Sequence, residues 1–88
     1  MTANSSDFRI SNDVRAVFRC DGASITVQIM RADKAVGSLM KYTLEEAVAL
    51  GNRIIESGSW DQFPVSGVPV DCLKDFGHRF RQYGLDGS

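Results

Sequence analysis

The sequence predicts an α+β fold of the order (β)βββαα, a two-layer sandwich with both helices on one face of an antiparallel sheet. Three observations support this. Apolar and polar residues alternate between residues 14 and 42, with short turns between the alternating runs. A helix-capping motif follows directly. Two later segments each have a single apolar face. With 88 residues, 43% of them hydrophobic, the chain is expected to form one domain around one core.

The N-terminal end decides whether the meander has three strands or four. Residues 1–7 are small and polar, which predicts a loose tail. Residues 8–11 alternate briefly and would form an additional edge strand. We therefore expect a single domain over residues 8–85, with a frayed C-terminus at residues 86–88.

The central strands are predicted by alternation. In residues 14–20, alternating residues face the core and solvent. The core-facing residues are Val14, Ala16, Phe18 and Cys20. Asp21-Gly22 is a hairpin signal. Residues 25–31 alternate again, with Val27 and Ile29 inward. After a turn at residues 32–35, residues 36–42 form the last strand, which completes an antiparallel meander.

Two helices complete the fold. Thr43 and Glu46 have the spacing of a capping box, and Gly58 is placed to end the first helix. After a connection over residues 57–68, Pro69 suits the first turn of a second helix, and Gly84 is expected to stop it. Mid-helix glycines lie on both apolar faces, at Gly51 and Gly77. Because such a glycine costs about 1 kcal/mol relative to alanine, we expect the helices to approach each other or the sheet closely there.

Composition excludes several classes of protein. The formal net charge is −1, so nothing in the overall charge indicates a nucleic-acid-binding protein. No apolar run reaches the roughly 18–20 residues needed to span a membrane, and no secretory signal is visible, which predicts a cytoplasmic protein without membrane contact. Cys20 and Cys72 both fall on apolar faces. Two buried free thiols are therefore expected, with a Cys20–Cys72 disulfide as the alternative.

The sequence contains only weak candidates for a catalytic or metal-binding site. Asp71, Asp75 and His78 share one side of the second helix, but carboxylates in a first turn also complement the helix dipole. Cys72 and His78 lie about 120° apart around that helix, so they cannot form a nucleophile–base pair on it. With one histidine and no paired-cysteine motif, we expect no metal, no cofactor and no enzymatic activity.

The outward sheet face is the predicted contact surface for a partner. It combines basic and apolar residues, namely Arg15, Val17, Arg19, Thr26, Gln28, Met30 and, if Val36, Met40 and Tyr42 point inward, Lys41. An ordinary solvated sheet face is the alternative. Trp60 and Phe63, in the connection between the helices, form a second candidate. Loop aromatics can anchor a partner, but in a small domain they more often close the open end of the core.

These observations favour a small non-enzymatic protein-interaction module whose partner presents an acidic surface. Small chains without a catalytic motif are often inhibitors or adaptors of larger assemblies. Phage proteins that block host enzymes or CRISPR complexes are examples of such inhibitors. Single-stranded nucleic acid is the alternative ligand of the same face. The meander and capped helix over about residues 8–57 resemble single-strand-binding coactivator domains of the ββββα type, whose sheets use basic and aromatic positions. An exposed edge strand would also allow a homodimer.

Overall fold

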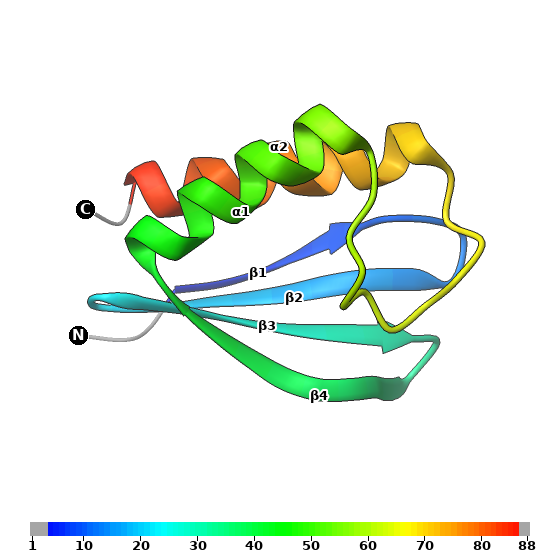
Figure 1. Cartoon of the computed structure of the whole chain (residues 1–88). Helices are drawn as coiled ribbons and strands as arrows, with labels where there is room; N and C mark the ends of the chain where they lie inside the picture. Colours follow the sequence, from blue (N-terminus) through cyan, green and yellow to red (C-terminus); the bar gives the residue numbers. More distant parts are fainter. Residues whose placement is uncertain (1–3, 87–88) are drawn as a thin grey trace.

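The computed structural model describes residues 4–86 and confirms the α+β fold. Four antiparallel strands form one sheet in the order β1-β2-β3-β4, and two helices lie side by side over one of its faces (Figure 1). The elements are β1 (Asn4–Arg9), β2 (Val14–Asp21), β3 (Ser24–Arg31), β4 (Lys34–Thr43), α1 (Leu44–Ser57) and α2 (Val70–Asp86). The remaining parts of the predicted tail and frayed end, residues 1–3 and 87–88, lie outside the described residues.

The first strand begins earlier than the sequence predicts. β1 covers residues 4–9 rather than 8–11, so residues 4–7 belong to the sheet and not to a tail. The strand pairs with β2 in an unbroken register, from Asn4 opposite Cys20 to Arg9 opposite Arg15. Backbone hydrogen bonding to a neighbouring strand is available to polar residues without any apolar alternation. The pattern of residues 4–7 therefore carries little signal for this strand.

The last strand contains a bulge that the sequence pattern does not reveal. Val27 pairs with Met40 and Ile29 with Val36, so three residues of β4, Gly37 to Leu39, face the single residue Gln28. A regular ladder would place one residue there. Gly37 adopts a φ of +72°, a conformation that favours glycine. β4 consequently bends midway along its length (Figure 1). It also starts at Lys34, two residues before the predicted start.

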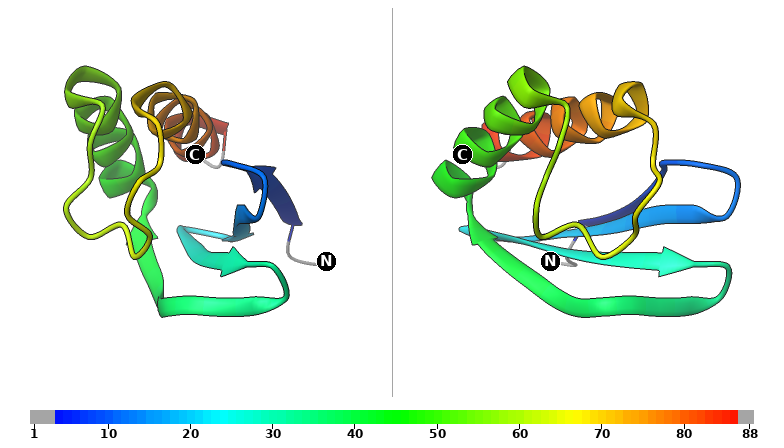
Figure 2. Two further views of the ribbon diagram at one scale, coloured as in Figure 1. Left: turned by 90° about the vertical axis from the view of Figure 1, so that its right-hand side faces the viewer. Right: turned by 45° about the vertical axis from the view of Figure 1, so that its right-hand side comes forward.

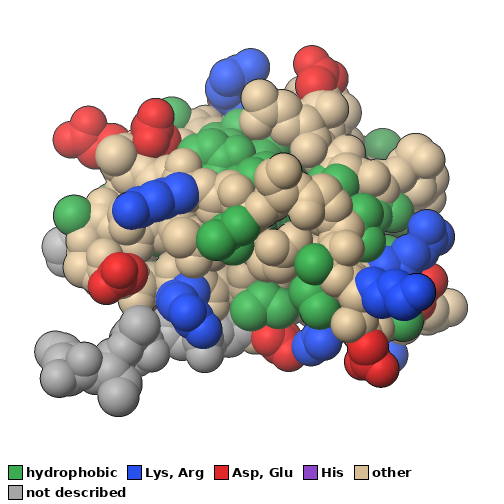
Figure 3. Space-filling view, turned by 90° about the horizontal axis from the view of Figure 1, so that it is seen from below, with side chains coloured by type: hydrophobic (Ala, Val, Ile, Leu, Met, Phe, Trp, Pro, Cys, Tyr) green, Lys and Arg blue, Asp and Glu red, His purple; other side chains and the backbone are tan. Residues whose placement is uncertain are grey.

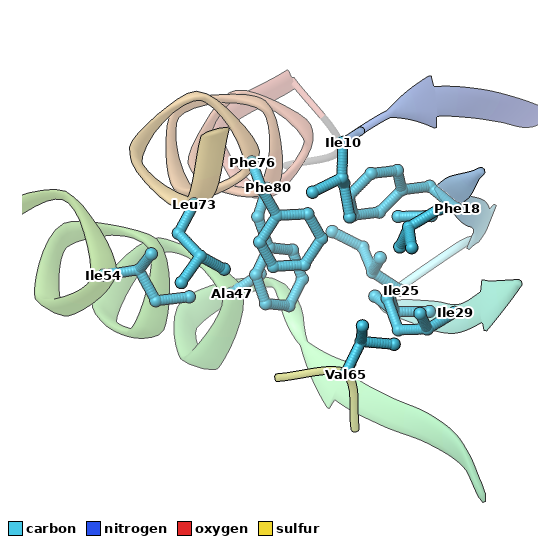
Figure 4. Packing of buried hydrophobic residues seen from close by; sticks show 13 residues of the cluster. Ile10, Phe18, Ile25, Ile29, Ala47, Ile54, Val65, Leu73, Phe76 and Phe80 are labelled. Atoms are coloured by element: carbon cyan, nitrogen blue, oxygen red, sulfur yellow. The ribbon is translucent and has the colours of Figure 1, made fainter. Parts of the chain in front are cut away.

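The core lies between the sheet and the helices. The predicted inward residues of β2 and β3 are buried, with the exception of Cys20, which is half-buried at the end of β2. Phe18 lies beneath the rings of α2, with ring centroids 5.6 Å from Phe76, 5.8 Å from Phe80 and 5.0 Å from Tyr83. Figure 4 shows the helix side chains pointing toward this strand layer. Aromatic pairs at such distances add about 0.5–1.5 kcal/mol each beyond the apolar area they bury.

The start and end of α1 confirm the predicted capping signals. The Thr43 hydroxyl accepts a hydrogen bond from the Glu46 backbone N–H at 3.1 Å. The Glu46 carboxylate in turn accepts one from the Thr43 N–H at 2.8 Å. Gly58 ends the helix with a φ of +69°, and its N–H donates to the Ile54 carbonyl at 2.7 Å. These local bonds fix the direction in which the chain leaves β4 and crosses the sheet.

The two helices approach each other through glycines, as predicted. A Cβ atom added at Gly51 would lie 2.8 Å from the carbonyl oxygen of Gly77 and 2.7 Å from Cβ of Arg81. An added Cβ at Gly77 would lie 3.1 Å from the carbonyl oxygen of Gly51. Real Cβ atoms essentially never come within 3.0 Å of such atoms, so the helix pair can reach this separation only with glycine at position 51. A methyl group at position 77 would require its neighbours to shift by a few tenths of an ångström.

The predicted end of the second helix is wrong. Gly84 does not stop α2, which continues to Asp86. Gly84 is instead buried against the start of α1, and a Cβ atom there would lie 2.8 Å from the carbonyl oxygen of Leu44. The glycine therefore serves close helix packing and not helix termination.

The segment between the helices closes one side of the core. After α1 it descends toward the sheet and then returns to α2 (Figure 2). Val65 is buried, and Trp60 and Phe63 pack against the core cluster. Pro64 lies against the β4 bulge, since a Cβ atom at Gly37 would come within 2.9 Å of its Cβ. The segment thus contacts the bulge as well as both helices.

We predict that Thr43→Ala lowers the free energy of unfolding by about 0.5–2 kcal/mol, because the first turn of α1 loses a hydrogen-bond acceptor. Denaturant unfolding followed by circular dichroism measures this change. Thr43→Ser keeps the hydroxyl and is the matched control. An unchanged midpoint in the alanine variant would show that the cap does not stabilise the helix.

We predict that Gly51→Ala destabilises the domain by about 2 kcal/mol, although alanine is the better helix former by about 1 kcal/mol. The new methyl group would press on backbone atoms of α2, which cannot move without separating the helices. Thermal unfolding measures the difference. Asn52→Ala, one residue along at an exposed position, should change stability by less than about 0.5 kcal/mol. A stabilised Gly51→Ala variant would contradict the glycine contact.

Candidate protein-interaction surface

The helices leave one face of the sheet uncovered, and the predicted contact residues lie on it. We define the outer sheet face by these outward strand residues: Asp7, Arg9, Arg15, Val17, Arg19, Asp21, Thr26, Gln28, Met30, Leu39 and Lys41. The register places Arg15 opposite Met30 and Val17 opposite Gln28. In the view from below, hydrophobic side chains lie between Lys or Arg side chains (Figure 3). The structure therefore brings the strand residues of the predicted site together.

The basic residues of this face are not equivalent. Arg15 forms an ion pair with Asp7 of β1 at 2.7 Å, so part of its charge is already compensated. Arg19 and Lys41 lie on either side of Thr26, in one row across three strands, and both are exposed. Within the described residues neither of these two takes part in an ion pair. This row is consequently the part of the face best able to meet an acidic group.

Arg9 adds a cation that the predicted site lacked. It is exposed on β1 directly opposite Arg15, and it was missed because the predicted outward residues came only from the alternation of residues 14–42. Asp21, at the tip of the hairpin, shares the outward side of β2 and reduces the local positive charge there. The outer sheet face is therefore moderately and not strongly basic.

Three apolar side chains lie among these charges. Val17 and Met30 are half-buried, and Leu39 is 60% exposed. Leu39 was also missed by the sequence prediction, because regular alternation does not mark the residues of a bulge. A glycine inside a strand pattern is the signal that could have indicated it, and Gly37 provides that signal. Leu39, in the bulge, is thereby exposed to solvent.

Gln28 has a structural role besides its place on the outer sheet face. Its side-chain amide donates to the carbonyl oxygens of Ile29, Val36 and Gly37, at 3.3, 3.4 and 3.5 Å. Two of these acceptors belong to the start of the β4 bulge. Gln28 is thus a positioning residue for the bulge, and its substitution would disturb Leu39 as well as remove an amide.

Trp60 and Phe63 lie apart from the outer sheet face, in the aromatic cluster of the core. The Trp60 ring stacks on Phe76 with centroids 5.5 Å apart and an interplanar angle of 20°. It also lies 6.4 Å from Tyr42 and 6.0 Å from Phe63. This packing matches the alternative in which these aromatics close the open end of the core. Both side chains are half-buried, so each retains an accessible part.

The two cysteines are free thiols in the structure, as expected, but both are half-buried and not fully buried as predicted. Cys72 lies in the first turn of α2, and Cys20 lies near the other end of that helix, where the charge of Asp86 is felt. Burial, assisted by that carboxylate, raises the pKa of the Cys20 thiol above its ordinary value. A raised pKa keeps the thiol protonated and weakly nucleophilic near neutral pH.

The remaining polar residues show no built site within the described part of the chain. Asp71, Asp75 and His78 are exposed on α2, and residues 4–86 contain no group of three His, Cys, Asp or Glu side chains that could hold a metal ion. No helix in residues 4–86 combines the length and apolar character that crossing a membrane requires. A scan against protein-family models and searches of curated proteins and of solved structures find no match to the chain.

We predict that Trp60→Ala lowers the free energy of unfolding by about 3 kcal/mol, because it opens a cavity beside Phe76 in the aromatic cluster. Chemical denaturation followed by circular dichroism measures the loss. Leu39→Ala removes a large but exposed side chain and should cost less than about 0.5 kcal/mol. Equal stability of the Trp60 variant and the wild type would mean that the ring does not stabilise the core.

Proposed function

We propose that this chain is a small non-enzymatic protein-interaction module that binds an acidic surface of a protein partner through its outer sheet face. The observation that carries the proposal is the uncovered row of Arg19, Thr26 and Lys41 beside the exposed Leu39. Interfaces of this kind combine a few apolar anchors with charges that select the partner. Val17 and Met30 extend the apolar part of the surface.

A protein partner is favoured over single-stranded nucleic acid. Proteins that bind single strands stack bases on aromatic side chains along a strongly basic groove. The outer sheet face has no aromatic residue among its described members, and Asp7 and Asp21 offset part of its positive charge. The sheet therefore lacks the stacking positions on which the resemblance to single-strand-binding coactivator domains would depend. Nucleic acid remains the alternative ligand, so the experiment must distinguish nucleic-acid binding from protein binding.

The proposal includes the setting of the interaction. We place it in the cytoplasm, which free Cys20 and Cys72 support because thiols stay reduced there. An inhibitor or adaptor of a larger assembly, including those that phages direct against host enzymes or CRISPR complexes, would use such a surface.

Association of two copies through an edge strand is a further prediction. β1 and β4 are the edges of the sheet, and the bulge interrupts one of them.

We predict that Arg19→Glu with Lys41→Glu weakens binding of the partner about 30-fold, as expected for the loss of about 2 kcal/mol of interface energy. Both side chains are exposed, so the melting temperature should change little. The measurement is affinity capture from nuclease-treated lysate of the source cell, with the captured protein then titrated against each variant.

The matched control is Lys74→Glu with Arg79→Glu, which changes the net charge equally but on α2. The proposal requires this control to bind like the wild type. A partner retained by the sheet variant and lost by the control would move the site to the helices. A fluorescent oligothymidylate that binds the wild type tightly, with affinity falling steeply as salt rises, would instead support the nucleic-acid alternative.

A further inference from the structure

A groove beside α1 has a different chemistry from the outer sheet face. It lies between α1 and the first residues of the segment that follows this helix, and its volume is about 840 Å³. Figure 2 shows this segment leaving the end of α1 and turning toward the sheet. The groove is open to solvent.

The floor of the groove is apolar and partly aromatic. Leu50 and Ile54 of α1 contribute aliphatic groups, while Tyr42 and Trp60 contribute rings whose centroids lie 6.4 Å apart. Behind the floor, the Trp60 ring stacks on Phe76, which holds it in place. A rigid aromatic group beside aliphatic side chains is a suitable receptor for one apolar anchor of a partner.

The rim of the groove is acidic. Glu46, Glu56 and Asp61 line it, against the single cation Arg53. Within the described part of the chain none of these three carboxylates forms an ion pair. Burial and, to a lesser extent, the charge of Glu46 raise the pKa of the Tyr42 hydroxyl above its ordinary value. The groove therefore offers negative charge on both sides of an apolar floor.

We propose that this groove binds a basic peptide segment of a protein partner, with an apolar side chain on the floor and Arg or Lys side chains at Glu56 and Asp61. The proposal concerns a second surface and is independent of the outer sheet face. Charge complementarity selects a cationic occupant, and the acidic rim repels phosphate groups. The groove lies between a helix and a loop, which suits an extended segment better than the broad sheet face of a second copy of this chain.

Trp60 gives a direct test, because it is the only tryptophan in the sequence and lines the groove. The probe is the peptide acetyl-Arg-Leu-Arg-Leu-Arg-amide, and acetyl-Glu-Leu-Glu-Leu-Glu-amide is its charge-reversed control. We expect the basic peptide to change Trp60 emission saturably, with affinity falling as NaCl is raised. The acidic peptide should leave the emission unchanged. A basic peptide without a saturable effect, or equal effects of both peptides, overturns the proposal.

Variants locate the binding. Glu56→Gln with Asp61→Asn should weaken the basic peptide about 5-fold, and Arg53→Gln should tighten it about 2-fold, as expected for solvent-exposed charge pairs. Asp71→Asn with Asp75→Asn removes the same charge from α2 and is the matched control, expected to bind like the wild type. Equal weakening by both double variants would show nonspecific attraction and overturn the site.

The test also separates the other occupants and the proposed function. A Trp60 emission change that depends on protein concentration without peptide would identify a second copy in the groove, which contradicts a basic peptide. Arg19→Gln with Lys41→Gln changes residues of the outer sheet face and should leave the affinity for the basic peptide unchanged. Each proposal can therefore be contradicted by its own measurement without affecting the result for the other surface.

Discussion

The contact between Gly51 of α1 and Gly77 of α2 is the constraint on which the architecture depends. With a side chain at Gly51, the two helices could not lie at their observed separation over one face of the sheet, and a side chain at Gly77 would force neighbouring atoms of α1 to shift. Gly84 maintains the same close contact at the start of α1. Because both helices fit on that face, every large aromatic side chain of α2 reaches the inner strand residues. The other face remains open to solvent, as the proposed binding surface requires.

The near-neutral net charge conceals a separation of charge between two surfaces. The outer sheet face carries Arg9, Arg19 and Lys41, while the groove beside α1 carries Glu56 and Asp61. Each surface also has an apolar component, Leu39 on the sheet and Trp60 in the groove. Under the two proposals, surfaces of opposite sign would let the chain contact two different groups at once. Composition, which averages over the whole molecule, cannot show such an arrangement.

The sequence predicted those features that depend on local or periodic signals. Strand alternation identified the inward residues Val27 and Ile29, and the capping box located the start of α1 correctly. The sequence-based prediction was wrong where contacts between residues distant in sequence determine the structure. The backbone pairing of residues 4–7 with β2, the passage of α2 through Gly84 and the groove beside Trp60 all depend on neighbours distant in sequence. The candidate strand residues were correctly grouped on one face, but Leu39 required knowledge of the bulge.

The bulge in β4 has a consequence for how the length of this strand can vary in evolution. Its insertion relative to β3 amounts to an even number of residues, since Val36 and Met40 both face the core on either side of it. Because strand side chains alternate with a period of two, a deletion of two residues here would preserve the inward and outward sets, whereas a deletion of one would exchange them for the following part of the strand. Relatives of this chain should therefore differ in length at this point by pairs of residues, and loss of a single residue should prevent Tyr42 from reaching the aromatic cluster.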